Sequence, residues 1–237
     1  MITRKLVNPA NKIHLQAIYH NRFDDCLTYR DQVWATLCHK FWQRFVPADG
    51  NVLDLGCGYG QFINHIRCHK KWAMDLNPST KQYLDNSVTL LEQDCSTRWN
   101  LPDRELDLVF TSNFFEHLPD KDALNRIINE AHRCLRDGGR LIAMGPNIKY
   151  LPGKYWDFWD HSLPLTEKSL AEGMRAVGFS IEKAVARFLP YTMVGGPRFP
   201  AFCIILYLRL PILWRIFGKQ FLVVARKTAL LDNDEVT

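Results

Sequence analysis

The residues that are best suited to binding or catalysis surround a glycine-rich turn early in the chain. An apolar segment, Val52–Leu55, runs directly into Gly56-Cys57-Gly58-Tyr59-Gly60, and apolar residues then recur at helical spacing. Glycines at a strand-to-helix turn accept a positive φ and let the backbone approach a ligand that a Cβ would repel. Several nucleotide-binding families share such a turn, so it indicates a ligand site without identifying the ligand.

Three acidic residues narrow the choice of ligand. Asp54 lies inside the apolar segment before the turn, Asp75 ends the next apolar run, and Asp94 follows a later one. Carboxylates at such positions can hold cationic or hydroxyl-bearing groups through charge-assisted hydrogen bonds. A dinucleotide is disfavoured, because Asp54 would repel its pyrophosphate and because the glycines follow G-x-G-x-G rather than G-x-G-x-x-G.

The elements that must position these residues form an alternating pattern. Short apolar runs expected to be strands are Val52–Leu55, Lys71–Met74, Val88–Leu91, Leu106–Phe110 and Arg140–Met144. Helices are expected between them, including Lys121–Leu135, and the later part adds a helix at Thr166–Val177 and strands at Ser180 to about Leu189 and Lys219–Arg226. This alternation predicts an α/β fold with a doubly wound, mostly parallel sheet and ligands at the carboxyl ends of its strands.

The chain, with 237 residues of which 47% are hydrophobic, is expected to form one domain, 1–237. Apolar residues at three- and four-residue steps predict a helical N-terminal cap at 1–46. The core is expected at 50–189 and 219–227, with an apolar, basic insertion at 190–218 between the last two strands.

Five motifs occur in an order and spacing that resemble one known family. They are the glycine turn with Asp54, then Met74-Asp75-Leu76-Asn77-Pro78, Leu91-Glu92-Gln93-Asp94-Cys95, Leu106–Asn113 with Phe115-Glu116-His117-Leu118, and Leu135–Leu141. Together they resemble the cofactor-binding half of class I S-adenosyl-L-methionine (SAM)-dependent methyltransferases of the methyltransferase-11 type. The resemblance implies a Rossmann-like sheet of seven strands, the last antiparallel, with SAM as the cofactor.

The resemblance also assigns cofactor contacts to particular residues. Asp54 would attract the SAM ammonium directly or through water, Asp75 would accept both ribose hydroxyls, and Asp94 with the Cys95 amide would contact the adenine edge. The full predicted set is Asp54, Gly56, Cys57, Gly58, Asp75, Leu76, Asp94, Cys95 and Asn113.

Methyl transfer from a sulfonium is an in-line displacement, and a general base is needed only when the acceptor must lose a proton. His161 beside Asp160, in the aromatic loop after the fifth strand, is the predicted catalytic pair; a structural hydrogen bond that holds this loop is the alternative for His161. Some family members bind a divalent metal near the position of Glu116-His117. Asn113 stands where a third acidic ligand would help, so no metal site is predicted.

The late part of the chain carries an unusual charge pattern. Net charge is +5, but residues 183–231 hold eight Lys or Arg and no acid, which leaves 5 − 8 = −3 for the remainder. Within 190–218 an apolar run is interrupted by Arg209 and Pro211, and a spanning helix needs about 20 apolar residues, so this segment is not expected to cross a membrane. It is expected either to pack on the sheet or on a second subunit, or to lie on an acidic membrane surface; nucleic acid is disfavoured because aliphatic residues separate the basic ones.

These features favour a SAM-dependent methyltransferase for a small-molecule, lipid-linked or saccharide-linked acceptor, with oxygen preferred as the methylated atom. An N-methyltransferase and a SAM-fold binding or scaffold protein without catalysis are the alternatives. Seven scattered cysteines without a Cys-x-x-Cys pair and the lack of a secretory signal favour the cytoplasm, with membrane association through 190–218 as an option. The sequence gives no indication of the oligomeric state.

Overall fold

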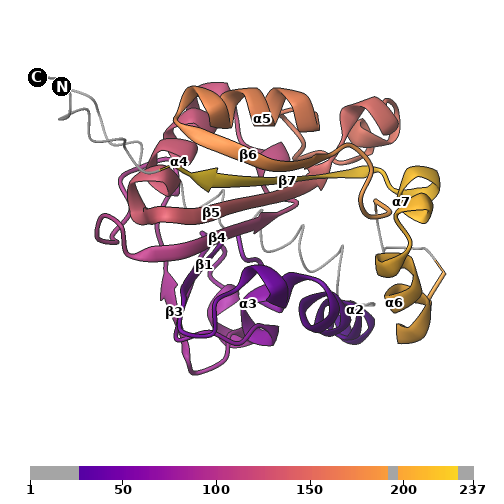
Figure 1. Cartoon of the computed structure of the whole chain (residues 1–237), viewed down its shortest axis with the longest axis horizontal. Coiled ribbons are helices and arrows are strands. Elements are labelled where there is room, and N and C mark those ends of the chain that lie inside the picture. Colours follow the sequence, from indigo (N-terminus) through magenta and orange to yellow (C-terminus); the bar gives the residue numbers. More distant parts are fainter. Residues whose placement is uncertain (1–26, 192–196, 229–237) are drawn as a thin grey trace, which may run out of the picture.

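A seven-stranded sheet forms the centre of the computed structural model, which describes residues 27–191 and 197–228 (Figure 1). Its order is β3-β2-β1-β4-β5-β7-β6. The strands are β1 (Asn51–Leu55), β2 (Lys70–Met74), β3 (Val88–Leu91), β4 (Leu106–Ser112), β5 (Leu135–Pro146), β6 (Phe179–Val185) and β7 (Gln220–Lys227). Strand β7 is antiparallel to β5 and β6, whereas the other neighbours are parallel. The predicted doubly wound, mostly parallel fold with an antiparallel last strand is confirmed.

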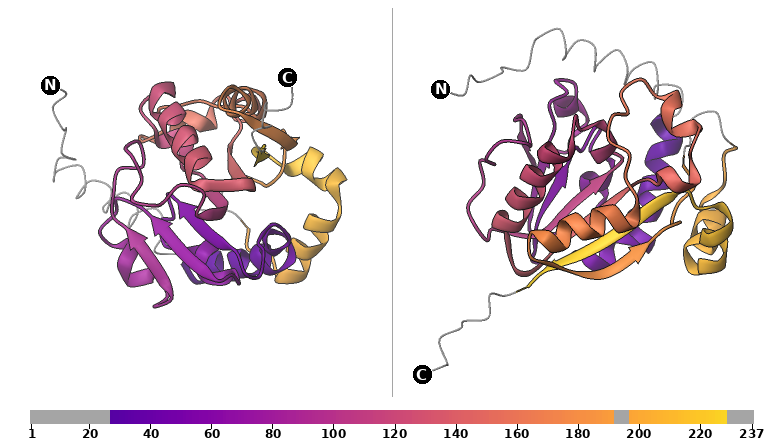
Figure 2. Two further views of the ribbon diagram at one scale, coloured as in Figure 1. Left: turned by 60° about the vertical axis from the view of Figure 1, so that its left-hand side comes forward. Right: turned by 90° about the horizontal axis from the view of Figure 1, so that it is seen from above.

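Helices cover both faces of this sheet, α4 and α5 on one and α2 and α3 on the other (Figures 1 and 2). The α-helices are α2 (Leu27–Lys40), α3 (Gln61–His65), α4 (Lys121–Cys134), α5 (Glu167–Ala176), α6 (Ala201–Arg209) and α7 (Pro211–Phe217). The 3-10 helices are η2 (Trp42–Phe45), η3 (Thr80–Tyr83), η4 (Phe115–His117), η5 (Ile148–Tyr150) and η6 (Lys154–Asp157). Helix α2 and η2 lie in the predicted N-terminal cap, and residues 1–26 of that cap lie outside the described part.

Two apolar cores follow from the alternation of side chains along the strands. Leu53 of β1 packs toward the α4 face with Ile127, whereas its neighbour Val52 packs toward the α2 face with Trp34 and Phe62. Strands buried on both faces read as continuous apolar runs, which is why they are recognisable in the sequence. Asp54 shares the face of Val52 and therefore points toward α2 and α3.

The predicted alternation is less regular in the first half of the sheet. Only the 3-10 helix η3 lies between β2 and β3, and residues 92–105 between β3 and β4 contain no helix. Side chains compete with helix formation there, because Asn77 accepts from the Ser79 amide at 3.0 Å and Asp94 accepts from the Ser96 amide at 2.8 Å. The predicted helices are therefore present between β1 and β2 and between β4 and β5, whereas these two connections hold no α-helix.

Several boundaries differ from those expected. Helix α4 starts after Asp120, whose side chain accepts from the Ala123 amide at 2.7 Å, and it ends at Cys134 because the next residue already belongs to β5. Strand β6 ends at Val185, short of the predicted end near Leu189. The chain nevertheless stays beside β7, since the Phe188 amide donates to the carbonyl of Gln220 at 2.6 Å.

The insertion between β6 and β7 forms α6 and α7 at one end of the sheet, where α6 lies beside α2 and α7 lies near the start of β7 (Figures 1 and 2). The Tyr207 hydroxyl donates to the Phe188 carbonyl at 2.6 Å, and Trp214 Nε1 donates to the Tyr207 carbonyl at 2.8 Å. The predicted helical insertion is therefore anchored to the body through its inward-facing side chains. Within the described residues, no helix combines the length and apolar character needed to cross a membrane.

Candidate active site

The glycine turn at the carboxyl end of β1 has a left-handed backbone conformation that is unfavourable for residues with a Cβ. Gly56, Gly58 and Gly60 have φ of 67°, 54° and 69°. A Cβ on Gly56 would lie 2.3 Å from Cγ of Phe114, so this position has neither the conformation nor the room for a side chain. The turn therefore keeps its backbone exposed toward the space above β1.

Hydrogen bonds join this turn to the end of β2. The Gly56 amide donates to the Met74 carbonyl at 2.8 Å, and the Gly58 amide donates to Oδ2 of Asp75 at 2.8 Å. The Thr80 hydroxyl donates to the Gly58 carbonyl at 2.8 Å. The glycine turn and Asp75 are therefore held as one rigid unit.

One buried carboxyl group, Asp54, and one partly buried, Asp75, give this unit its electrostatic character. Burial raises the pKa of Asp54 to about 8, the Ile63 amide lowers it in part, and the charge of Asp75 raises it further. Burial likewise raises the pKa of Asp75, against hydrogen bonds from the amides of Asn77 and Gly58. Dehydrated carboxyl groups of this kind gain most from a bound cation, which favours their charged form.

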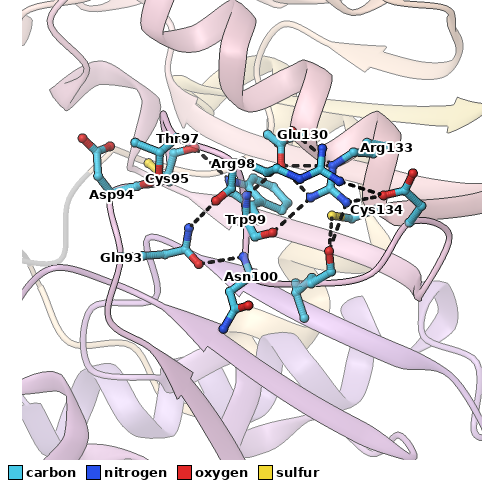
Figure 3. Close-up of polar contacts among 12 residues, drawn as sticks. Gln93, Asp94, Cys95, Thr97, Arg98, Trp99, Asn100, Glu130, Arg133 and Cys134 are labelled. Atoms are coloured by element: carbon cyan, nitrogen blue, oxygen red, sulfur yellow. Dashed lines mark hydrogen bonds and ion pairs between the residues drawn. The ribbon is translucent and has the colours of Figure 1, made fainter. Parts of the chain in front are cut away.

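The loop that carries Asp94 and Cys95 is braced by its own polar contacts (Figure 3). Oδ1 of Asp94 accepts from the amide and the hydroxyl of Ser96 at 2.8 and 2.7 Å. The Gln93 side chain donates to the Arg98 carbonyl at 3.0 Å and accepts from the Asn100 amide at 2.9 Å. The loop is thus closed at its base with Asp94 at its outer end.

A second set of contacts fixes the same loop to α4 (Figure 3). The indole of Trp99 donates to the Cys95 carbonyl at 2.8 Å, and the Trp99 amide donates to Oε2 of Glu130 at 2.7 Å. The guanidinium of Arg133 binds Glu130 and donates to the carbonyls of Trp99 at 3.1 Å and Leu101 at 3.0 Å. The position of Cys95 is therefore fixed by contacts between its loop and helix α4.

A cavity of about 720 Å³ opens beside the turn. Among the predicted cofactor residues it is lined by Asp54, Gly56, Cys57, Gly58 and Asn113, whereas Asp75, Leu76, Asp94 and Cys95 do not line it. Asp75 is adjacent to the cavity through its bond to the Gly58 amide. The structure thus brings Asn113, at the end of β4, to the same cavity as Asp54 and the glycine turn.

The same cavity continues between the N-terminal helix and the insertion. Its further walls are apolar and aromatic side chains of α2 and of the segment from Pro197 through α7; they include Val33, Trp34, Leu37, Phe199, Ile204, Leu206, Tyr207, Leu213 and Phe217. The sequence predicted the helical stripe of α2 but not its place in a cavity wall. That place could not be read from periodicity, because a cavity wall and a core face show the same apolar spacing.

Asn113 turns the chain at the end of β4. It has a φ of 50°, its amide donates to the Met144 carbonyl at 2.8 Å, and its side chain donates to the Ser112 hydroxyl at 3.1 Å. Asparagine tolerates this left-handed conformation better than most residues. The turn delivers Glu116 and His117, in η4, to the wall of the cavity.

Two histidines and an aspartate meet there. Nδ1 of His117 lies 3.2 Å from Oδ2 of Asp160 and 3.1 Å from its carbonyl oxygen. His161 is 8% exposed, its ring stacks on Phe158 at 5.0 Å, and it meets the His117 ring edge-on at 5.0 Å. The sequence paired Asp160 with its neighbour His161 and considered Glu116-His117 only as a possible metal position. No sequence signal predicted that His117 contacts Asp160, which is 43 residues later.

Glu116 links the aromatic loop to the β4 end. Its carbonyl accepts from the amides of Ser162 at 2.8 Å and Leu163 at 3.0 Å. Its carboxylate and ring nitrogens of His117 and His161 lie within 4.8 Å of one another, and such a set can hold a divalent cation. The third ligand that the sequence lacked at Asn113 is thus supplied by His161, and the cluster has the chemistry for either proton transfer or metal binding.

Comparison with known proteins identifies the family. The sequence profile of the family described as Methyltransferase domain matches residues 27–184. The chain is 35% identical over 105 residues to the uncharacterized protein MJ0638 of Methanocaldococcus jannaschii, covering 40% of each chain. It is 29% identical over 117 residues to a sarcosine/dimethylglycine N-methyltransferase of Halorhodospira halochloris, covering 44% of this chain and 40% of that one. The matches thus span about two fifths of the length of these curated relatives.

Solved structures share the fold at lower identity. One is a complex between the Trm112 methyltransferase activator of Haloferax volcanii and its methyltransferase partner, with a TM-score of 0.65 and 17% identity, covering 87% of this chain and 95% of that one. Another is a SAM-dependent methyltransferase of Archaeoglobus fulgidus, with a TM-score of 0.62 and 21% identity, covering 84% and 94%. The fold of this chain is thus shared with a SAM-dependent methyltransferase. Since the family profile covers more than half of the chain, the chain belongs to the methyltransferase domain family.

Proposed function

We propose that this chain transfers the methyl group of SAM to a hydroxyl oxygen of an acceptor with a long apolar part, such as a lipid-linked or saccharide-lipid molecule. The observation that carries the proposal is the lining of the cavity. This one cavity is lined by the glycine turn, by Glu116, His117 and His161, and by apolar side chains of α2, α6 and α7. Donor, proton acceptor and apolar acceptor tail can therefore occupy one space.

The donor end fits the cationic groups and the hydroxyls of SAM. The Asp54 carboxyl, buried beside the turn, would pair with the ammonium, and the backbone of Gly56 and Gly58, which lines the cavity, would allow its close approach. Each oxygen of Asp75 accepts one backbone amide and retains a second lone pair for a ribose hydroxyl. The braced loop at Asp94 and Cys95 would meet the adenine, which completes the predicted set with Leu76.

The acceptor end is suited to hydrocarbon. Pockets for small molecules are mostly apolar, with a few polar groups that fix orientation. Here the polar groups cluster at the turn and at the histidines, and Leu37, Ile204 and Leu213 are among the apolar side chains beyond them. An acceptor would therefore place its hydroxyl near the histidines and its apolar part between α2 and the insertion.

The chemistry follows from this placement. The acceptor oxygen attacks the methyl carbon, the carbon–sulfur bond breaks, and the sulfonium becomes the neutral thioether of S-adenosylhomocysteine. The hydroxyl proton passes to Nε2 of His117, whose Nδ1 faces Asp160 at 3.2 Å. Asp160 would hold this ring and stabilise its protonated form. His161, predicted as the base from the sequence, lines the same cavity and is the alternative proton acceptor.

Nitrogen is the alternative acceptor atom. One relative of this chain is a sarcosine/dimethylglycine N-methyltransferase. A neutral amine attacks without prior loss of a proton, so it needs the His117–Asp160 pair less than a hydroxyl does. A scaffold without catalysis would have no need for the buried Asp54 carboxyl that lines the cavity, which argues against that alternative.

Alkyl glycosides of increasing chain length, used as soluble acceptors, test the proposal through release of S-adenosylhomocysteine. Each methylene buried in the cavity contributes about 0.8 kcal/mol, so kcat/KM is expected to rise about fourfold per methylene until the cavity is filled. Release that does not depend on chain length would contradict an apolar acceptor. Binding of SAM without release for any hydroxyl or amine acceptor would favour the scaffold alternative.

Removal of metal ions with a chelator tests whether the Glu116–His117–His161 cluster transfers protons or binds a catalytic metal. If the histidines transfer protons, turnover is expected to be unchanged after treatment with EDTA. A loss that added Mg²⁺, Mn²⁺ or Zn²⁺ restores would show instead that the cluster holds a catalytic metal.

A further inference from the structure

The two helices of the insertion expose an apolar surface that the rest of the described chain does not cover. Seven large side chains on α6, α7 and the segment just before them are each 39–68% exposed; they are Phe199, Phe202, Leu206, Leu210, Ile212, Ile216 and Phe217. We call this set the insertion patch. An apolar surface of this extent on a soluble face marks an interaction site.

The patch is a fixed surface, because the opposite sides of both helices are anchored. Trp214 and Leu208 are buried, and the Trp214 ring packs on Phe188 at 4.9 Å. The Arg187 guanidinium donates to the carbonyls of Gly218 at 2.8 Å and Ile216 at 2.6 Å, which ties down the end of α7. The exposed residues are therefore held outward by the anchors.

The positive charge beside the insertion patch favours an acidic partner. Arg198, Arg209 and Arg215 are exposed beside its apolar residues, and residues 183–231 contain no acidic side chain. In a symmetric dimer formed through this patch, the arginines of both copies would share one interface, and residues 183–231 offer no acidic side chain to pair with them, which is unfavourable. An acidic lipid surface accepts both the apolar side chains and the arginines.

We infer that the insertion patch docks this protein onto the surface of an anionic membrane. Phe202, Leu210, Ile212 and Ile216 face outward without lining the cavity, so they are the inserting side chains. The arginines lie near the lipid phosphates. Both helices lie on the membrane surface rather than across it, in keeping with the short lengths of α6 and α7, nine and seven residues.

Part of the patch also lines the cavity. Phe199, Leu206 and Phe217 line the cavity and are at the same time more than half exposed. A lipid-linked acceptor can therefore pass from the membrane to the histidines along apolar walls. This second step rests on the proposed function, whereas docking itself does not.

Flotation with vesicles of phosphatidylcholine, with and without phosphatidylglycerol, tests the docking. The wild-type protein is expected to float with the anionic vesicles, more weakly at high salt, and weakly with neutral vesicles, because salt screens the arginines but not the apolar contacts. The double variant Phe202→Ser/Ile212→Ser is expected to lose at least tenfold in partitioning at both salt concentrations. Its thermal unfolding should be unchanged, since both side chains are exposed.

A matched pair of charge-reversal variants measures the electrostatic contribution to vesicle binding. Arg215→Glu is expected to reduce binding to anionic vesicles severalfold, whereas Arg126→Glu, an exposed change on α4 across the sheet, is expected to leave it unchanged. Equal losses for both variants would show that only net charge matters and would overturn a specific patch.

Two results would refute the inference. One is wild-type protein that stays with the buffer at low salt in the presence of anionic vesicles. The other is a dimer, detected by light scattering, that Phe202→Ser/Ile212→Ser dissociates, since the patch would then be a subunit interface. Turnover of soluble alkyl glycosides needs no membrane, so failure of docking and failure of the proposed acceptor are distinguished.

Discussion

Gly56→Ala is expected to abolish SAM binding and to lower the free energy of unfolding by about 2–5 kcal/mol. The left-handed backbone at φ 67° contributes about 1–2 kcal/mol of this loss for a residue with a Cβ. The new methyl group would also lie 2.3–2.8 Å from three atoms of Phe114, and such overpacking costs about 1–3 kcal/mol. Relief of the clash must move either the turn or the end of β4, and both line the donor site.

Chemical denaturation and calorimetric titration with SAM measure the two effects. Gly173→Ala is the matched control, because a Cβ at this position in α5 would have no atom within 4 Å. Alanine in a helix interior is more favourable than glycine by about 0.5–1 kcal/mol, so this control is expected to gain stability and to bind SAM normally. Normal SAM affinity in Gly56→Ala would show that the turn does not hold the cofactor.

His117→Ala is expected to lower kcat by about 10²–10⁴ with a hydroxyl acceptor while leaving SAM affinity unchanged. The reason is that Nε2 of this residue takes the acceptor proton in the proposed mechanism. Asp160→Asn is expected to lower kcat less, because it removes the charge that holds and stabilises the ring but not the ring itself. The wild-type profile of rate against pH should show a fall toward acid that His117→Ala lacks.

His161→Ala and His39→Ala complete this series. His39 lies exposed on α2, so its replacement is expected to leave kcat unchanged. If His161 only packs against Phe158, its replacement is expected to reduce kcat less than that of His117. A larger loss for His161→Ala, together with loss of the acid limb, would transfer the role of base to His161, as the sequence predicted.

Much of the fold was predictable because its signals are local. The buried strands read as apolar runs, the glycines mark a backbone that few other residues adopt, and Asp54 and Asp75 follow those runs directly. Boundaries were less predictable, since Asn77 and Asp94 form turns with their side chains where the alternation suggested helices. The strand β6 likewise ends early although its chain continues beside β7.

The functional arrangement of the acceptor side depends on contacts between distant segments. The proximity of His117 to Asp160 requires the aromatic loop to fold back on the carbonyl of Glu116, and no local pattern encodes that return. Apolar residues of α2 and the insertion share the pattern of ordinary core residues. Only their position around one cavity distinguishes them from core residues. The spacing of apolar residues in a sequence shows which face of a helix is apolar, but it does not show whether that face meets the core or a cavity.

Calorimetric titration with SAM at pH 7, in two buffers of different ionisation enthalpy, tests the central claim that Asp54 and the glycine turn hold the cofactor. Without a ligand, the pKa of about 8 keeps Asp54 mostly protonated at this pH, and a bound ammonium lowers that pKa, so about one proton should leave per SAM bound. We predict saturable binding with this release in the wild-type protein, and weaker binding with less release in Asp54→Asn. Folded wild-type protein that does not bind SAM, or unchanged affinity and unchanged proton release in Asp54→Asn, would contradict the account.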